Sequence, residues 1–447
     1  MGKEFGPQPK YMRWMYTGIV RPALTYGAVV WWRKIYDATH MKRFTKISRL
    51  ALLTFGSARK GTPTVGMEAI GYIPPMDLFL EGEVAKTWFR IRDIRPEIWD
   101  GVGSTIGRGH RHDLRKLVDK MALPAFELDD IPETKKWTRL YQVDTDFGAG
   151  TPFKSPITCF TDGAKLNNGN TGSGYCVNSP HMTLKIDAFS LGKAPTAYQA
   201  ELNAILKAAG GLLPYAKRGP IIIHTDSQTA LRALDSPVIT SKLVLDTAYA
   251  LDLLALTSNS MVTLVWVKAH AGHAGNELAD SLAKQGAAIP IDDLDQVIPL
   301  PKSYYTKLIN DEVARRWNHR WTKQTSIARQ SRLLWPCIDR SRSLQILLCD
   351  RQEYGNLIRL FTGHNNLNRH RHLLNETDTA ECRLCLEEEE SSEHLLLQCP
   401  AIGGSRHHLL GSISTDGSSL SAMPLDGVRR FISLICRALS SEGLEKI

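Results

Sequence analysis

The spacing of hydrophobic and polar residues changes along this chain of 447 residues, and the changes mark its regions. Within residues 1–145, apolar side chains recur every three or four positions, as at Met12, Met15 and Ile19. This spacing places apolar side chains on one face of a helix. A cluster of Gly, Thr and Pro at residues 61–64 interrupts the pattern. The first region is therefore predicted to be mostly helical.

The middle of the chain, residues 155–290, alternates between strand patterns and helical patterns. It follows a polar stretch from Val143 to Pro156, whose Asp, Gly, Thr and Pro content predicts a linker. Short apolar or alternating runs predict strands, and longer runs with helical spacing predict helices. The predicted strands are Ile157–Thr161, Gly174–Asn178, Thr183–Phe189, Ile221–Thr225 and Val262–Val267, and the clearest helices are Ala197–Ala209 and Gly275–Ala287.

The last region, residues 300–447, begins after a Pro-Leu-Pro break that ends at Pro301. A basic, Trp-containing amphipathic stretch from Tyr304 to Lys323 predicts a helix, and a cysteine-rich tail follows. The chain is long enough for several domains, each with its own core. Three regions are thus expected: helical, α/β, and helical with a cysteine cluster.

Composition and charge limit the cellular location and the type of partner that we expect for the protein. A net charge of +9 suits a polyanionic partner, although many basic proteins bind no nucleic acid. The N-terminus has no apolar signal core, and no run approaches the roughly 18–20 apolar residues that a membrane span needs. Eight cysteines without a signal peptide indicate reduced thiols. We expect an intracellular protein without a membrane partner, and the sequence leaves nucleus or cytoplasm open.

Four carboxylates of the central region occupy positions that suit a metal site. Asp162 and Asp226 end predicted strands, and Glu201 and Asp280 lie on predicted helices. Water attack on a phosphodiester is accelerated when two divalent ions roughly 4 Å apart stabilise the attacking and leaving oxygens. Sparse carboxylates suit Mg²⁺, which prefers oxygen ligands and retains waters. Taken singly, Asp226 could instead be a helix N-cap, Asp162 a turn residue and Glu201 an exposed helical charge.

The segments that carry these residues, I-T-C-F-T-D-G, A-Y-Q-A-E-L, I-I-I-H-T-D-S-Q and W-V-K-A-H-A-G-H-A-G-N-E-L-A-D, resemble type 1 ribonuclease H in identity and order. The resemblance covers residues 155–290. It implies a five-stranded mixed sheet flanked by helices. It also implies that the four carboxylates converge and bind two Mg²⁺ or Mn²⁺ ions.

The same resemblance gives roles to residues of the loop and helix that follow the last strand. His270, in a glycine-containing loop, is expected to shuttle protons near the metal ions, since an imidazole titrates near neutral pH. His273 is the nearby alternative, but only His270 matches the position of the family's histidine. Glu277 also matches and is expected to assist the metal ligands.

Contacts to substrate are implied for Asn168 and Gln228, which match family positions near the minor groove of the hybrid. The 2′-hydroxyl exposed there distinguishes RNA from DNA. The small residue usual after Asp-Gly is present as Ala164, whereas Ala269 replaces the usual glycine before the loop histidine. No long basic helix stands out between residues 231 and 256, so other regions are expected to contribute affinity.

The tail contains the pattern C-x2-C-x8-H-x4-C, which is typical of a structural zinc site. Three thiolates and one imidazole satisfy tetrahedral zinc and leave no open position. The alternative is a chance group of unliganded cysteines. With its flanking residues, the pattern resembles the C-terminal knuckle of non-LTR retrotransposon proteins. The expected ligands of one zinc ion are Cys382, Cys385, His394 and Cys399.

The charged residues around this pattern include one acidic run and one basic run, which have opposite consequences for phosphate binding. Four consecutive glutamates, residues 387–390, lie within the zinc loop and should repel phosphate. The basic run at residues 369–372 is a better candidate for phosphate contact, and a solvated helix face explains it equally well.

The first region resembles the thumb of non-LTR retrotransposon reverse transcriptases, through Y-M-R-W-M-Y-T-G-I-V-R-P-A-L-T-Y-G-A-V-V-W-W and T-P-T-V-G-M-E-A-I-G-Y-I-P-P-M-D-L. The palm is expected to be absent. The Asp pairs at 129–130 and 292–293 lack the aromatic-x-Asp-Asp hairpin that a polymerase needs.

Together, these resemblances imply a retrotransposon-derived hydrolase. The expected reaction is endonucleolytic hydrolysis of RNA in RNA–DNA hybrids, and a full-length retrotransposon polyprotein is a further expected partner. One alternative is a catalytically silent, nucleic-acid-binding remnant. Another is a resolvase or other nuclease of the same fold, which the hybrid-facing Asn168 and Gln228 disfavour.

Overall fold

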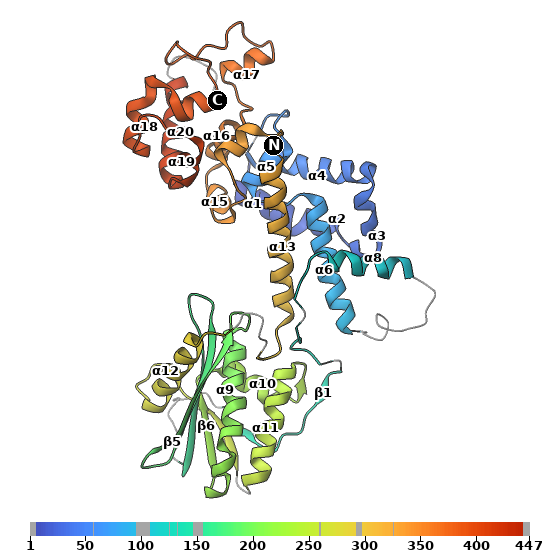
Figure 1. The fold of residues 1–447 in the computed structure, drawn as a ribbon, viewed down its shortest axis with the longest axis vertical. Coiled ribbons are helices and arrows are strands. Elements are labelled where there is room, and N and C mark those ends of the chain that lie inside the picture. The colour runs from blue at the N-terminus through green and yellow to red at the C-terminus, as the bar shows by residue number, and fades with distance from the viewer. Residues whose placement is uncertain are drawn as a thin grey trace. The chain divides into compact units, whose positions relative to one another are not determined.

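The computed structural model describes residues 6–56, 58–94, 108–124, 126–131, 133–145, 155–258, 261–291, 297–324 and 326–440. It divides the chain into two compact units (Figure 1). The sheet unit comprises Phe89–Arg111 and Ala122–Leu308, and the helical unit comprises Met1–Trp88, His112–Met121 and Ile309–Ile447. The Asp pair at 292–293 lies outside the described residues.

The sheet unit is built on a mixed, six-stranded sheet with the strand order β2-β8-β6-β3-β4-β5. β3, β4 and β5 are antiparallel neighbours, whereas β2, β8, β6 and β3 run parallel. The strands are β2 (Gln142–Val143), β3 (Ile157–Lys165), β4 (Thr171–Asn178), β5 (Thr183–Gly192), β6 (Ile221–Thr225) and β8 (Val262–Trp266). A separate two-stranded ribbon pairs β1 (Lys135–Lys136) with β7 (Val238–Ile239).

Helices cover both faces of this sheet. α12 lies on one face, and α9 and α11 lie on the other (Figure 1). Glycines let α12 approach closely: a Cβ on Gly174 of β4 would lie 2.6 Å from the Ala283 nitrogen. The helices are α9 (Ala197–Leu212), η3 (Leu213–Arg218), α10 (Gln228–Asp235), α11 (Lys242–Ser258) and α12 (Ala274–Ala288).

The predicted number of five strands is wrong, because a sixth, β2, forms just where the linker was expected to begin. It belongs to a strap, residues 128–131 and 133–144, that packs along the sheet unit. The Tyr141 side chain is buried, and its hydroxyl donates to the Leu234 carbonyl at 2.9 Å. Asp129 accepts hydrogen bonds from Ser241 Oγ at 2.6 Å and from the Leu243 nitrogen at 2.9 Å. Asp129 therefore has a structural role.

The helical regions before and after the sheet unit are confirmed as helical. Most of these helices are short, and π- or 3₁₀-helical turns join some of them. Before the strands in the sequence they are α1 (Pro9–Met15), η1 (Tyr16–Val20), α2 (Arg21–Leu24), α3 (Ala28–Trp31), η2 (Trp32–Tyr36), α4 (Ala38–Gly56), α5 (Thr64–Gly71), α6 (Met76–Ile94) and α8 (Arg108–Asp119). After α12 they are α13 (Lys302–Lys323), α14 (Arg329–Leu334), α15 (Arg340–Ile346), α16 (Arg351–Thr362), α17 (Asn368–Leu373), η4 (His394–Gln398), η5 (Pro400–Ile402), α18 (Gly403–Leu410), α19 (Gly417–Ala422) and α20 (Leu425–Ser440).

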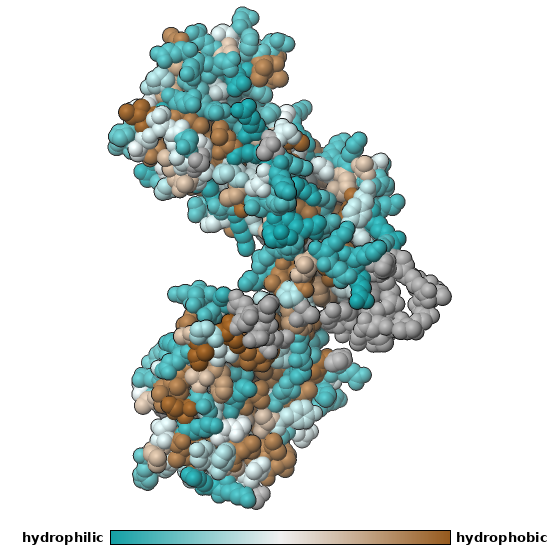
Figure 2. All heavy atoms as spheres, viewed as in Figure 1, coloured by the Kyte–Doolittle hydropathy of each residue, from teal (hydrophilic) through white to brown (hydrophobic). Residues whose placement is uncertain are grey.

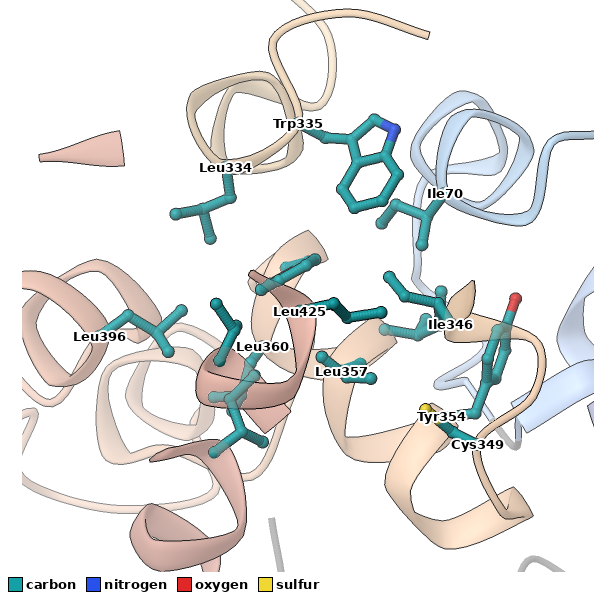
Figure 3. Close-up of a cluster of buried hydrophobic side chains, with 14 of the residues drawn as sticks. Ile70, Leu334, Trp335, Ile346, Cys349, Tyr354, Leu357, Leu360, Leu396 and Leu425 are labelled. Atoms are coloured by element: carbon teal, nitrogen blue, oxygen red, sulfur yellow. The ribbon is translucent and has the colours of Figure 1, made fainter. Parts of the chain in front are cut away.

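One hydrophobic core joins the first and last regions, so three expected regions correspond to two compact units. Ile70 of α5 lies beside Trp335 and Ile346, which come from the last region (Figure 3). The backbones also approach closely, since a Cβ on Gly355 would lie 2.5 Å from the Gly56 carbonyl oxygen. Local spacing patterns could not reveal this core, because its halves are separated by the sheet unit in the sequence.

The surface of the helical unit is largely hydrophilic on the face drawn in Figure 2, with smaller apolar patches. Within the described part of the chain, no helix is both long enough and apolar enough to cross a membrane.

Candidate active site and metal centre

Parallel pairing of β3 with β6 brings two of the predicted carboxylates together. Thr161 pairs with Thr225, so the next residues, Asp162 and Asp226, lie side by side at one edge of the sheet. The alternative role of Asp226 as an N-cap does not apply, because Ser227 caps α10 by accepting from the Ala230 nitrogen at 3.3 Å. Asp162 lies within β3 and is not a turn residue.

A glycine places Glu201 against the same strand. Glu201 lies near the start of α9, a helix that begins with a capping box between Thr196 and Gln199. A Cβ on Gly163 would lie 2.3 Å from the Glu201 nitrogen, so only glycine permits this approach. The glycine after Asp162 therefore serves the docking of α9. Glu201 is not an exposed helical charge, because its Oε2 atom is buried.

The carboxylates of Asp162, Glu201 and Asp226 form a compact cluster, in which one oxygen of each lies within 4.8 Å of the others. Among the described residues, the buried Oε2 of Glu201 has no hydrogen-bond partner. Oxygen donors and a buried, unpartnered carboxylate oxygen fit a hard divalent cation such as Mg²⁺ or Mn²⁺.

Mutual repulsion and burial change the acidity of this cluster. Burial raises the pKa of Asp162 to about 7, and the neighbouring charges of Asp226 and Asp280 add to the effect. Burial, with Asp162 and Asp226 nearby, also raises the pKa of Glu201 well above its usual range. The pKa of Asp226 is raised by burial as well. A bound cation would relieve all three effects, because it offsets the concentrated negative charge.

Asp280 adds charge to the cluster from α12 but lies outside the group of three. Its carboxylate is held by Lys284, one turn further along the helix, at 2.7 Å. The close packing of α12 on the glycines of β4 brings Asp280 toward this edge of the sheet.

His270 lies in the exposed loop between β8 and α12, with an unusual positive φ of 53°. Burial raises the pKa of Asp226, and a nearby imidazolium at His270 would oppose that rise. His273 instead occupies the N-cap position of α12, where its carbonyl accepts from the Glu277 nitrogen at 3.0 Å. The side chain of Glu277 is exposed in the first turn of that helix.

Asn276 was not identified from the sequence as a site residue. Its side chain is buried and hydrogen-bonds Asp226, which opposes the larger rise in the pKa of that carboxyl caused by burial. In the sequence, the only indication of a role for this residue is that it directly precedes Glu277 in the segment N-E-L-A-D.

The two predicted substrate contacts lie at the ends of neighbouring elements. Asn168 is exposed at the tip of the β3–β4 hairpin, where its Oδ1 accepts from the Asn170 nitrogen at 3.0 Å. Gln228 is the first residue of α10, two positions after Asp226, and is partly exposed. Both are therefore accessible to a ligand.

The cysteine pattern of the tail folds into a second cluster, in the helical unit. One ligand atom from each of Cys382, Cys385, His394 and Cys399 lies within 4.8 Å of the others. Sγ of Cys385 lies 3.3 Å from Nε2 of His394, and the other ring nitrogen of His394 lies 2.9 Å from Glu388. A carboxylate on the second nitrogen is typical of a metal-bound histidine. The donor set fits zinc.

The four glutamates of this loop do not form a uniform acidic surface. Glu390 is fully buried and accepts hydrogen bonds from the Arg383 side chain and from the Asn368 nitrogen. Glu389 forms an ion pair of 3.0 Å with Arg369. The basic run at 369–372 is thus partly neutralised by the glutamates of the cysteine-cluster loop.

Comparison with known proteins places the sheet unit in a family. Residues 154–288 match the family model of RNase H. Ribonuclease H of Neisseria gonorrhoeae is 31% identical over 144 residues, which are 30% of this chain and 97% of that protein. A 115 kDa protein of the retrotransposable element R1DM of Drosophila melanogaster is 31% identical over 75 residues, 17% of this chain and 7% of that protein.

Among solved structures, RNase H1 from Halobacterium salinarum shares 22% identity, with a TM-score of 0.25 over 29% of this chain and 96% of that one. The near-complete coverage of the bacterial enzyme, at 31% identity, is decisive. The chain belongs to the ribonuclease H family of enzymes, through a domain that spans residues 154–288.

Proposed function

We propose that this protein hydrolyses the RNA strand of RNA–DNA hybrids endonucleolytically. The observation that carries the proposal is the convergence of Asp162, Glu201 and Asp226 within 4.8 Å, inside a ribonuclease H domain. Three chain segments supply these carboxylates, and the simpler structural role considered for each of them does not apply.

In this proposal, Asp162, Glu201, Asp226 and Asp280 hold two Mg²⁺ or Mn²⁺ ions. When bound, such ions activate water and stabilise charge on the attacking and leaving oxygens. The protein's own contribution is to fix the ligands. Asn276 orients Asp226, and the contact of α9 with Gly163 positions Glu201.

His270 is proposed to transfer a proton at its imidazole as the reaction proceeds. Its exposed loop lets the ring move between solvent and the carboxylate cluster. His273, whose backbone carbonyl begins α12, is not assigned this role. Asn168 and Gln228 are proposed to contact the hybrid near its minor groove, with Glu277 assisting the ligands from α12.

One zinc ion is proposed to bind Cys382, Cys385, His394 and Cys399. With all four positions taken by protein, the ion would have a structural role. Cys382 and Cys399 belong to the shared core of the helical unit and Cys385 packs against it, so the ion would stabilise that unit.

We also propose a retrotransposon origin, with the helical unit containing a thumb-like region and a C-terminal knuckle. The similarity to the R1DM protein supports this origin, although it spans only 75 residues. A full-length polyprotein would then be a partner, and the site of action would be intracellular.

Cleavage assays test the central proposal. Purified protein should cleave a labelled RNA–DNA hybrid in Mg²⁺ and leave matched DNA and RNA duplexes intact, and Asp226→Asn should abolish the activity. If wild-type protein binds the hybrid without cleaving it in Mg²⁺ or Mn²⁺, the silent-remnant alternative is correct. Cleavage of branched DNA in preference to the hybrid would indicate the resolvase alternative.

A further inference from the structure

A cleft of about 770 Å³ in the helical unit is strongly basic. It lies between the loop after α4, the first turns of α16 and the last turns of α20. None of its lining residues belongs to the carboxylate cluster or the cysteine cluster. Six cationic side chains and two carboxylates line it: Arg59, Lys60, Arg351, Arg359, Arg429 and Arg437, with Asp350 and Glu353.

Carboxylates neutralise only part of this charge, since Arg59 pairs with Glu376 at 3.5 Å and Glu353 pairs with a single arginine. Asp350 is the N-cap of α16 and accepts from the Glu353 nitrogen at 2.8 Å. Glu353 is already paired with Arg429 at 2.7 Å. Among the ion pairs of the described residues, none involves Lys60 or Arg437. The cleft therefore keeps an excess of positive charge.

Arg359 makes this excess energetically costly. Burial lowers the pKa of its guanidinium, and the nearby charge of Arg59 lowers it further. One guanidinium nitrogen donates to Asn356 Oδ1 at 2.6 Å. An anion that enters the cleft would offset the cost of holding cations together in a partly desolvated place.

The cleft continues along α20 into a second cleft of about 700 Å³. The two share the α20 residues Arg429, Ser433 and Arg437, which are spaced four apart and so lie on one helix face. The second cleft adds His408, together with Arg430 and its ion-pair partner Asp426 at 2.7 Å. The two clefts form one extended basic groove.

The chemistry of the groove selects phosphates over bases. Arginine forks bind phosphate oxygens in bidentate fashion. Among the described residues, no Phe, Tyr or Trp side chain lines either cleft, so His408 is the single ring that a base could stack on. Each cleft falls within the roughly 300–1,000 Å³ of pockets that enclose small ligands. A single strand fits such a space better than a duplex does.

We propose that this basic groove binds the phosphodiester backbone of single-stranded nucleic acid without sequence preference. The proposal does not rest on hybrid cleavage, because its residues and those of the carboxylate cluster belong to different units. A protein inactive on hybrids could still bind through this groove.

Fluorescence anisotropy of the full-length protein tests the proposal. The probes are labelled dodecamers of uridine and of mixed sequence, measured on an Asp226→Asn background so that no RNA is cut. The groove variant is Lys60→Gln with Arg437→Gln, two exposed residues whose loss should preserve the fold. Binding to both probes should weaken about tenfold, and the salt slope should fall by about 1.4, at roughly 0.7 for each lost contact.

The matched control is Lys42→Gln with Arg43→Gln, which removes the same charge from the exposed face of α4. It should bind within about twofold of the parent. If both variants weaken binding equally, the loss of affinity is explained by the change in net charge alone, and the proposal is overturned. The proposal would also be overturned if the groove variant binds as tightly as the parent and a 4-thiouridine probe does not crosslink to α16 or α20. Crosslinking to these helices would support it.

Two further probes separate the possible sources of phosphate. Inorganic tripolyphosphate that displaces the dodecamer at equal phosphate concentration would identify a small-anion site instead. Tighter binding of a DNA duplex through the same residues would overturn the single-strand assignment. A melting temperature equal to that of the parent confirms that each variant is folded.

Discussion

The two candidate metal sites of this protein are assembled in different ways. The carboxylate cluster takes ligands from β3, α9 and the end of β6, so long-range strand pairing creates it. The cysteine cluster takes all four ligands from residues 382–399, so one local loop creates it. The sheet holds the carboxylates of the first site in place whether or not an ion is bound, whereas we expect the local order of the second site to depend on a bound ion.

This difference predicts opposite responses to loss of a ligand. In the carboxylate cluster, removing one charge relieves repulsion, so activity is lost while the fold remains. In the cysteine cluster, removing one ligand costs stability, and the chemistry of the other unit remains. The following predictions, from the largest effect to the smallest, test that contrast.

Changing Cys399 to Ser should eliminate bound zinc and destabilise the helical unit. Structural zinc sites contribute on the order of 10 kcal/mol of binding free energy to folding. Cys399 is buried in the core shared by both terminal regions, so the loss should extend beyond the loop. Elemental analysis and thermal unfolding measure both effects, and hybrid cleavage should persist. Wild-type protein without zinc, purified in the absence of chelator, would refute the site.

Changing Asp226 to Asn should reduce hybrid cleavage by about 10³-fold or more, a magnitude typical of losing a group that stabilises transition-state charge. The shape is kept, so circular dichroism should be unchanged and the melting temperature equal or higher. Retention of more than a few per cent of turnover in a folded variant would exclude Asp226 as a metal ligand.

Changing His270 to Ala should lower turnover by about 10²-fold, the lower end of the range for general acid–base groups. KM should change little, because His270 is not expected to contact the backbone of the hybrid. His273→Ala is the control and should be nearly silent in steady-state assays. An exchange of these two effects would move the proton-transfer role to His273 and leave the carboxylate cluster unaffected.

The smallest effect concerns the pH dependence of metal-free stability. Because the pKa of Asp162 is raised to about 7 in the folded state, its protonated form stabilises the fold at low pH, and this contribution is lost as pH rises from about 4 to about 7. The melting temperature of Asp162→Asn should therefore be a few degrees higher than that of wild type at pH 8 and nearly equal to it at pH 4. Thermal melts without divalent cations measure the gap. A gap independent of pH would contradict the proposed repulsion.

How much the sequence could predict follows from the same contrast. The cysteine pattern is local, and the structure brings those four residues together. The carboxylates needed a family resemblance, because only the register of Thr161 with Thr225 shows why Asp162 meets Asp226. No sequence pattern indicated the hydrogen bond between Asn276 and Asp226. β2 has two residues, too few for an alternating pattern, and the shared core joins segments that are distant in sequence.

The strap before the sheet has a consequence for where this domain can be cut. The family match begins at residue 154, but buried Tyr141 and the helix-capping Asp129 lie upstream of it. A fragment trimmed to the match would lose the buried Tyr141 side chain and leave the Leu243 nitrogen in the first turn of α11 without its acceptor, although Ser241 would still cap the Val244 nitrogen. We therefore expect the stable unit to be longer than the segment shared with bacterial relatives. Independent expression of this nuclease should start near residue 126, ahead of the strap.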